Sequence, residues 1–160
     1  MNTKVTAVPA GFQSVTPSLT LKDSKTALAF YQKAFGATVL DMFPAPDGRR
    51  TMHATMRIGN SILMMGDEMP GADCQSAESL GTTPIGLYVY VPDADAVFRQ
   101  ALAAGATATM PVADMFWGDR CGMLKDPFGY AWTIATHTRD LTGEEIQQGA
   151  RAFFEKVGNR

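Results

Sequence analysis

The sequence repeats one pattern of helix boundaries in its two halves. An amphipathic stretch that follows Asp23 closes at Gly36, and a second stretch that follows Asp93 closes at Gly105. The two aspartates lie 70 residues apart and the two glycines 69 apart. Aspartate caps the first turn of a helix, and glycine adopts the left-handed conformation that often ends one. A repeat of about 70 residues that occurs only twice does not make a solenoid. It predicts instead two modules, each of one strand, one helix and three further strands.

We therefore predict an α+β fold of two tandem βαβββ modules with a C-terminal helix, all within one domain over residues 1–160. The tail begins with Thr142-Gly143-Glu144-Glu145, a pattern typical of a capping box. An apolar stripe at helical spacing follows, which we expect to pack on the domain or on a second subunit: Ile146, Ala150, Phe153, Phe154 and Val157. The predicted boundaries are about 12–66 for module one, 67–83 for a linker, 84–138 for module two and 142–157 for the helix.

Composition excludes several classes of protein. Hydrophobic residues make up 46% of the chain and charged residues 19%, which is typical of a globular fold. The net charge of −2, without a run of lysine or arginine, argues against a nucleic-acid partner. No apolar segment approaches the roughly 20 residues of a membrane span. Since residues 1–11 do not form a secretory signal, we expect a cytoplasmic protein with Cys74 and Cys121 as reduced thiols.

The leading strand of each module alternates between two kinds of side chain. The aliphatic faces, expected to pack on the helices, are Val15, Leu19 and Leu21 in the first strand and Ile85, Leu87, Val89 and Val91 in the second. The opposite faces are Thr16, Ser18 and Thr20, then Gly86, Tyr88 and Tyr90. Because neighbouring tyrosines are unusual on a plain solvent-exposed face, we predict that these polar and aromatic faces bind a small ligand.

Single residues leave alternatives open. His53 is a structural histidine or a ligand-contacting base, and His137 is interpreted as having no functional role. The loop at Trp117 and Arg120 holds a planar or anionic ligand, or else Arg120 pairs with Asp119 within a turn. Four methionines of module one are expected mainly in the core, with Met64 as a candidate ligand contact: Met52, Met56, Met64 and Met65.

The element order resembles the vicinal oxygen chelate superfamily of glyoxalases, bleomycin-resistance proteins and extradiol dioxygenases. The local sequence is closer to its PhnB-like branch over roughly residues 13–145. The motifs that carry this resemblance are Val15-Thr16-Pro17-Ser18-Leu19, Ala29-Phe30-Tyr31-Gln32-Lys33-Ala34-Phe35-Gly36-Ala37, Met52-His53-Ala54, Phe116-Trp117-Gly118-Asp119-Arg120 and Asp126-Pro127-Phe128-Gly129-Tyr130-Ala131-Trp132. The resemblance implies curled mixed sheets that form a cleft.

The resemblance also implies metal ligands in catalytic members, two per module. Carried over to this chain, those positions fall at or near Thr16, Met64, Gly86 and Thr133, where catalytic members have histidine, glutamine or glutamate. A divalent metal needs about four nitrogen or oxygen donors, which these residues supply poorly. We therefore predict no metal site and no cofactor.

Our first hypothesis is a homodimeric, metal-free small-molecule binding protein of the bleomycin-resistance type. Its expected ligand-binding residues are Thr16, Ser18, His53, Thr55, Met64, Tyr88, Tyr90, Trp117, Arg120 and Thr133. The rival is a glyoxalase-like lyase or related enzyme whose metal is held by His53 with carboxylates from Asp119 or Glu68. A third hypothesis is a dimerisation module without a ligand.

Overall fold

A computed structural model describes residues 5–158 of the chain, with side chains described for residues 5–156. The predicted apolar position Val157 therefore lies outside the described side chains, and residues 1–4 of the N-terminal segment lie outside the described chain. Two compact units make up the protein, Met1–Thr83 and Pro84–Arg160. Each unit contains one four-stranded mixed sheet, so the predicted α+β architecture with two βαβββ modules and a C-terminal helix is confirmed.

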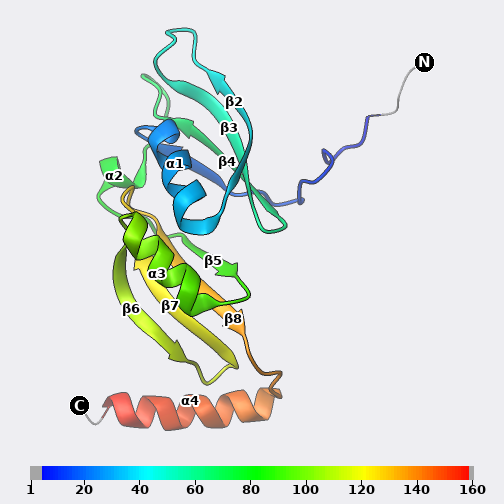
Figure 1. Ribbon diagram of the computed structural model, residues 1–160, viewed down its shortest axis with the longest axis vertical. Coiled ribbons are helices and arrows are strands. Elements are labelled where there is room, and N and C mark those ends of the chain that lie inside the picture. Colours follow the sequence, from blue (N-terminus) through cyan, green and yellow to red (C-terminus); the bar gives the residue numbers. More distant parts are fainter. Residues whose placement is uncertain (1–4, 159–160) are drawn as a thin grey trace. The chain divides into compact units, whose positions relative to one another are not determined.

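The first unit builds its sheet in the order β1-β4-β3-β2. Strand β1 runs parallel to β4, and the other neighbours are antiparallel. Helix α1 packs on one face of this sheet (Figure 1) and buries Leu28, Tyr31 and Ala34. The elements are β1 Ser18–Leu21, α1 Ser24–Phe35, β2 Thr38–Pro44, β3 Thr51–Ile58, β4 Ser61–Asp67 and α2 Ala77–Leu80.

The second unit repeats this topology in the order β5-β8-β7-β6, again with its first strand parallel to its last. Helix α3 packs on β6, β7 and β8 and buries Phe98 and Ala101 (Figure 1). The other sheet face therefore carries Tyr88 and Tyr90, because side chains alternate along a strand. The elements are β5 Gly86–Tyr90, α3 Ala94–Ala104, β6 Thr107–Asp114, β7 Asp119–Lys125, β8 Ala131–His137 and α4 Gly143–Gly158.

The repeated helix boundaries are confirmed in both units. Asp23 accepts a hydrogen bond from the Thr26 amide at 3.0 Å, and Asp93 accepts one from the Ala96 amide at 2.9 Å. Gly36 and Gly105 end α1 and α3 with positive φ angles of 65° and 118°. Each side chain caps one of the amide groups that a helix start leaves without a partner within the helix.

Helix α4 begins with the predicted capping box and packs on the second unit. The Thr142 amide donates to Glu145 Oε2 at 2.7 Å, and the Glu145 amide donates to Thr142 Oγ1 at 3.3 Å. A Cβ atom at Gly149 would lie 2.8 Å from the side chain of Phe116, so only glycine allows this close approach. The ring of Phe153 lies 5.7 Å from that of Phe116.

Three predictions about packing are wrong. Strand β1 begins only at Ser18, and Val15 is 85% exposed. Because Pro17 has no amide proton and contributes only its carbonyl, bonded to the Met64 amide at 2.9 Å, the regular strand starts after it. Ile85 lies just outside β5 and is 61% exposed, and Met52 is 56% exposed instead of buried. By contrast, Met56 and Met65 are core residues, as predicted.

The predicted linker contains a short helix, α2, capped by the Ser76 side chain. Both cysteines are free, with Cys74 exposed and Cys121 buried. None of the described helices combines the length and the hydrophobicity that crossing a membrane requires.

Candidate small-molecule binding face

A buried carboxylate, Asp119, organises the open face of the second sheet. Its side chain is 3% exposed, and its Oδ2 accepts three hydrogen bonds. The donors are the Tyr88 hydroxyl at 2.8 Å, the Tyr90 hydroxyl at 3.0 Å and the Trp117 indole Nε1 at 3.2 Å. Three predicted ligand-binding residues therefore meet at one oxygen atom, and we call these four residues with His137 the Asp119 cluster.

The tyrosines of this cluster are fixed at their hydroxyl ends and open to solvent along their rings. Tyr88 is 46% exposed and Tyr90 61% exposed, although both hydroxyls reach the buried carboxylate. Their ring centroids lie 5.1 Å apart, with 46° between the ring planes. Thr133 pairs with Tyr88 in the sheet register, and Met123 pairs with Thr133 on the next strand. The face thus offers preoriented aromatic surface beside a methionine and a threonine.

Hydrogen bonding keeps Asp119 ionised despite its burial. Burial raises the pKa of this carboxyl, but hydrogen bonds from His137, Tyr88, Tyr90 and Trp117 outweigh that effect and hold the pKa below its usual value. In return, burial and the bond to Asp119 raise the pKa of Tyr88, so this phenol keeps its proton. The buried Cys121 lies in an apolar cluster with Met115 and Ala135. Its burial raises the pKa of the thiol, which argues against a nucleophilic role.

His137 joins the same carboxylate from the end of β8. Its Nδ1 lies 2.8 Å from Asp119 Oδ1, and its Nε2 lies 2.9 Å from Asp140 Oδ1. The bond to Asp140, and then that to Asp119, raises the pKa of the imidazole. The sequence alone favours no functional role for His137, and the structure places its imidazole beside Asp119.

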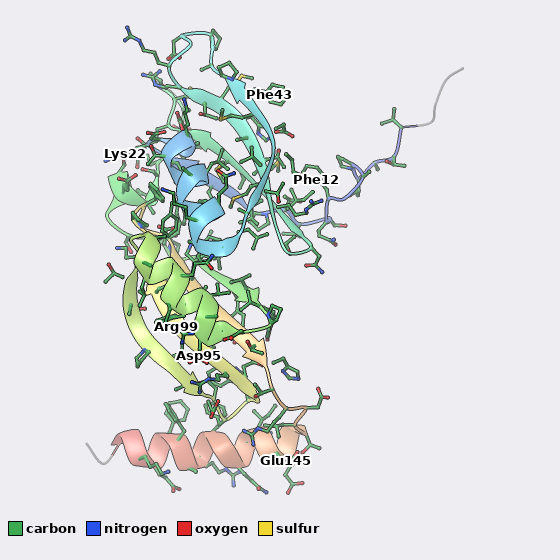
Figure 2. All side chains as sticks on the ribbon, in the orientation of Figure 1. Phe12, Lys22, Phe43, Asp95, Arg99 and Glu145 are labelled. Carbon is green, nitrogen blue, oxygen red and sulfur yellow. The ribbon has the colours of Figure 1, made fainter. Side chains whose placement is uncertain are left out.

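Arg120 does not join this cluster. Its Nε and Nη2 bind the two carboxylate oxygens of Asp95 at 2.6 and 2.8 Å, and its Nη1 binds Asp114 at 3.1 Å. Figure 2 labels Asp95 on α3, so Arg120 faces the helix-covered side of the sheet. The predicted pair between Asp119 and Arg120 is wrong, because consecutive strand residues point to opposite faces. The structure thus separates Arg120 from Trp117, the residue with which it was expected to hold an anion.

Four of the five candidates of the first unit line two separate pockets. Ser18 and His53 line a pocket of about 240 Å³ with Thr20 and Gly66. Thr16 and Met64 line another, of about 370 Å³, together with residues from 7–14. The Thr16 hydroxyl donates to the Gln13 carbonyl at 3.0 Å.

Thr55 is 1% exposed, and its hydroxyl lies 3.1 Å from His53 Nε2. The same nitrogen lies 3.9 Å from Asp41 Oδ1, and Phe43 stacks on the imidazole with a centroid distance of 6.4 Å. Asp41 Oδ1 is buried and has no hydrogen-bond partner among the described residues. In the first unit, His53 therefore lies against Thr55 and the ring of Phe43. This arrangement differs from the one in the second unit, where three donors meet at one oxygen atom of Asp119.

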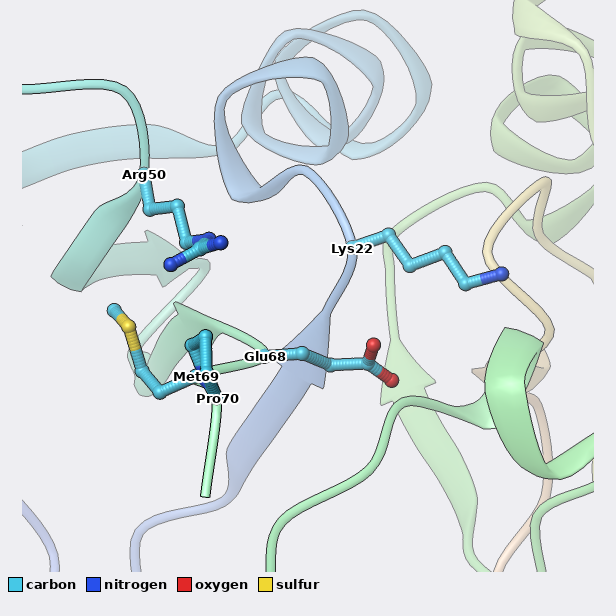
Figure 3. A pocket seen from close by; sticks show the side chains of 5 residues that line it. All are labelled: Lys22, Arg50, Glu68, Met69 and Pro70. Atoms are coloured by element: carbon cyan, nitrogen blue, oxygen red, sulfur yellow. The ribbon is translucent and has the colours of Figure 1, made fainter. Parts of the chain in front are cut away.

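A third pocket of the first unit is charged (Figure 3). Lys22, Arg50 and Glu68 line a volume of about 350 Å³, with Lys22 and Arg50 on opposite sides of Glu68. Hydrogen bonds from Ser79 and Ser76 lower the pKa of Glu68 to about 2, and Arg50 lies 3.2 Å from Asp47. Glu68 and Arg50 therefore both have partners within the unit.

The donor set does not fit the metal that catalytic relatives are expected to hold. At the two positions of the first unit where catalytic members have metal ligands, this chain has Thr16, which offers a hydroxyl, and Met64, which offers a thioether. In the second unit these positions are Gly86, which has no side chain, and Thr133. Hydroxyl and thioether groups are weak ligands for the divalent metals that imidazole and carboxylate bind. Within residues 5–156, no group of three or more His, Cys, Asp or Glu side chains is arranged to hold a metal ion.

The predicted set of ligand-binding residues lacks Asp119 and His137. The strand register of the hairpin between β7 and β8 would have identified both. Counting six residues outward from the Lys125–Ala131 pair brings Asp119 opposite His137. Since side chains alternate, the same count places Cys121 on this face and Arg120 on the other. A register drawn from the Asp126–Gly129 turn would therefore have found the cluster.

Comparison with known proteins agrees with this topology. The model of the Glyoxalase/Bleomycin resistance protein/Dioxygenase superfamily matches residues 12–134. An uncharacterized protein of Mycobacterium bovis is 39% identical over 137 residues, which cover 84% of this chain and 90% of that protein. The crystal structure of TioX from Micromonospora sp. ML1 has a TM-score of 0.63 and 27% identity, covering 78% of this chain and 98% of its own. A PhnB protein from Bacillus cereus shares the fold at 21% identity, with a TM-score of 0.61 over 78% of this chain and 99% of its own. The chain belongs to the glyoxalase/bleomycin resistance protein/dioxygenase superfamily.

Proposed function

We propose that this protein binds a small molecule on the open face of its second sheet and does so without the metal used by catalytic members of the superfamily. The observation that carries the proposal is the pair of exposed tyrosine rings whose hydroxyls are both held by Asp119. Burying a carboxylate is costly unless it is well hydrogen-bonded, so four side chains are committed to this arrangement. The arrangement preorganises ring surface, which lowers the entropic cost of binding.

The motif resemblance supports membership of the PhnB-like branch as part of this proposal. The weak donors at Thr16, Met64, Gly86 and Thr133 favour a binding protein over a metal-dependent lyase. A homodimer and a cytoplasmic location stay predictions. The exposed Phe153 and Phe154 of α4 are the residues that a second subunit would be expected to cover.

A thermal-shift screen of the full chain against small aromatic, peptide-like and thiol compounds tests the proposal. A ligand at a hundred times its dissociation constant stabilises the native state by about 2.7 kcal/mol, which raises the melting temperature. We expect Tyr90→Ala to abolish that shift. Ile85→Ala is the matched control, because Ile85 and Tyr90 are both 61% exposed and Ile85 lies just before β5, outside the Asp119 cluster, and it should keep the shift.

Two results would overturn the proposal. One is a screen in which no stabilisation depends on Tyr90. The other is stoichiometric zinc, nickel, manganese or iron in carefully purified protein, lost in His53→Ala, which would favour the lyase.

A further inference from the structure

We infer that the ligand of the second sheet is a planar cation that donates hydrogen bonds. This inference rests on the proposed function and adds the chemical class of the ligand. It follows from where the protons of the Asp119 cluster are committed, from the charges around the cluster and from the shape of its exposed surface.

The hydrogen-bond donors of the Asp119 cluster are already used. A phenol has one proton, and both Tyr88 and Tyr90 donate theirs to Asp119 Oδ2. The indole of Trp117 has a single N–H, which points to the same oxygen. What the two phenol oxygens offer to a ligand is therefore lone pairs, so a ligand that binds to these oxygens must bring the protons.

The charges of the cluster favour a cation. Asp119 and Asp140 supply two negative charges, and the imidazole of His137, which bonds to both, supplies at most one positive charge, so the cluster stays net negative. Arg120 lies on the other face, bound by Asp95 and Asp114. Lys125 is six residues along β7 from Asp119, roughly 20 Å at the rise of a strand.

The exposed surface suits a flat, partly apolar body. The faces of the two tyrosine rings attract cations through their quadrupole. The rings lie side by side on β5, and Met123, which is 39% exposed, lies two strands away in register. A planar cation can therefore stack on a tyrosine ring while its N–H groups reach the phenol oxygens.

Three compounds of nearly one shape test the ligand class: benzamidine, benzamide and benzoate, which are cationic, neutral and anionic at pH 7. The chain has two tryptophans, and each indole N–H gives a signal in an NMR titration of the full chain. Trp117 lies in the cluster, whereas Trp132 is buried and bound to Asp126, so the Trp132 signal is the internal control. We expect benzamidine to shift the Trp117 signal with an affinity about tenfold above that of benzoate, with benzamide between them.

Variants separate the charge of the cluster from its rings. Asp119→Asn should abolish the preference for benzamidine, and an unchanged Trp132 signal reports that the second unit remains folded. Tyr90→Phe keeps the ring but removes one acceptor, and it should weaken benzamidine severalfold while leaving benzoate unchanged. If benzoate binds as tightly as benzamidine and its signal depends on Tyr90, the inferred class is wrong while the proposed function stands. If none of the three compounds shifts the Trp117 signal at millimolar concentration, the inferred class is wrong, and the thermal-shift screen decides the proposed function separately.

Discussion

The second unit buries two aspartates, and each binds the indole of a tryptophan, but the two carboxylates have different surroundings. Asp126 accepts from the amides of Phe128 and Tyr130 at 3.0 and 2.8 Å and from Trp132 Nε1 at 2.9 Å. These three donors come from its own hairpin. Asp119 accepts from side chains on β5, on β8 and in the loop before β7, and two of those donors have exposed rings.

This difference separates a carboxylate that shapes the backbone from one that orients surface side chains. Removing the first should cost folding free energy, because buried amide groups lose their acceptor. Removing the second should cost binding, because the tyrosines lose the group that fixes their hydroxyls. In this fold, a buried acceptor whose donors are themselves exposed therefore indicates a binding site.

The largest expected effect on stability is that of Asp126→Ala. Two backbone amides and one indole would lose their acceptor in a buried turn, and we expect the free energy of unfolding to fall by about 4 kcal/mol. Both tryptophans lie in the second unit, so urea denaturation followed by their fluorescence measures this loss. A decrease below about 1 kcal/mol would remove the distinction between the two aspartates. At low urea, the folded fraction should still bind benzamidine.

A smaller effect is expected at the rim of the Asp119 cluster, in His137→Gln. The pKa of His137 is raised by Asp140 and Asp119, so the protonated imidazole stabilises the folded state. That contribution is complete below the ordinary histidine pKa of about 6.5 and is lost as the pH rises through the higher folded-state value. The difference in urea midpoint between the wild type and His137→Gln should therefore be largest at pH 5.5 and shrink by pH 8.5. Asp140→Asn, which removes one of the two partners, should retain part of this pH dependence. A difference that is constant with pH would show that His137 acts without its charge.

Local rules were enough to predict much of the fold. The caps at Asp23 and Asp93, the glycine ends of both helices and the capping box at Thr142 each depend on a few neighbouring residues, and all are confirmed. The error at Val15 arose because alternation was extended through Pro17, which cannot supply the amide that a regular strand needs.

The candidate site was only partly predictable. Tyr88, Tyr90 and Trp117 were identified by residue type, but the carboxylate that joins them required the strand register. Pairing Arg120 with its neighbour Asp119 overlooked strand alternation, which sends Arg120 toward Asp95 on α3. Residue type indicates which side chains suit a ligand, whereas register and face decide which of them meet.

The smallest effect is expected for Arg120→Lys, on the helix-covered face. A lysine cannot reproduce the two parallel bonds to Asp95, but the pair is partly exposed, and exposed ion pairs contribute little to stability. We expect a slight decrease in the urea midpoint and unchanged binding of benzamidine. Arg99→Lys is the control, since it alters an exposed arginine of α3 and keeps the positive charge that acts on Asp95 (Figure 2). If Arg120→Lys abolished ligand binding while Arg99→Lys did not, the two sheet faces would not be independent. Asp119 alone would then no longer account for the recognition of a cation.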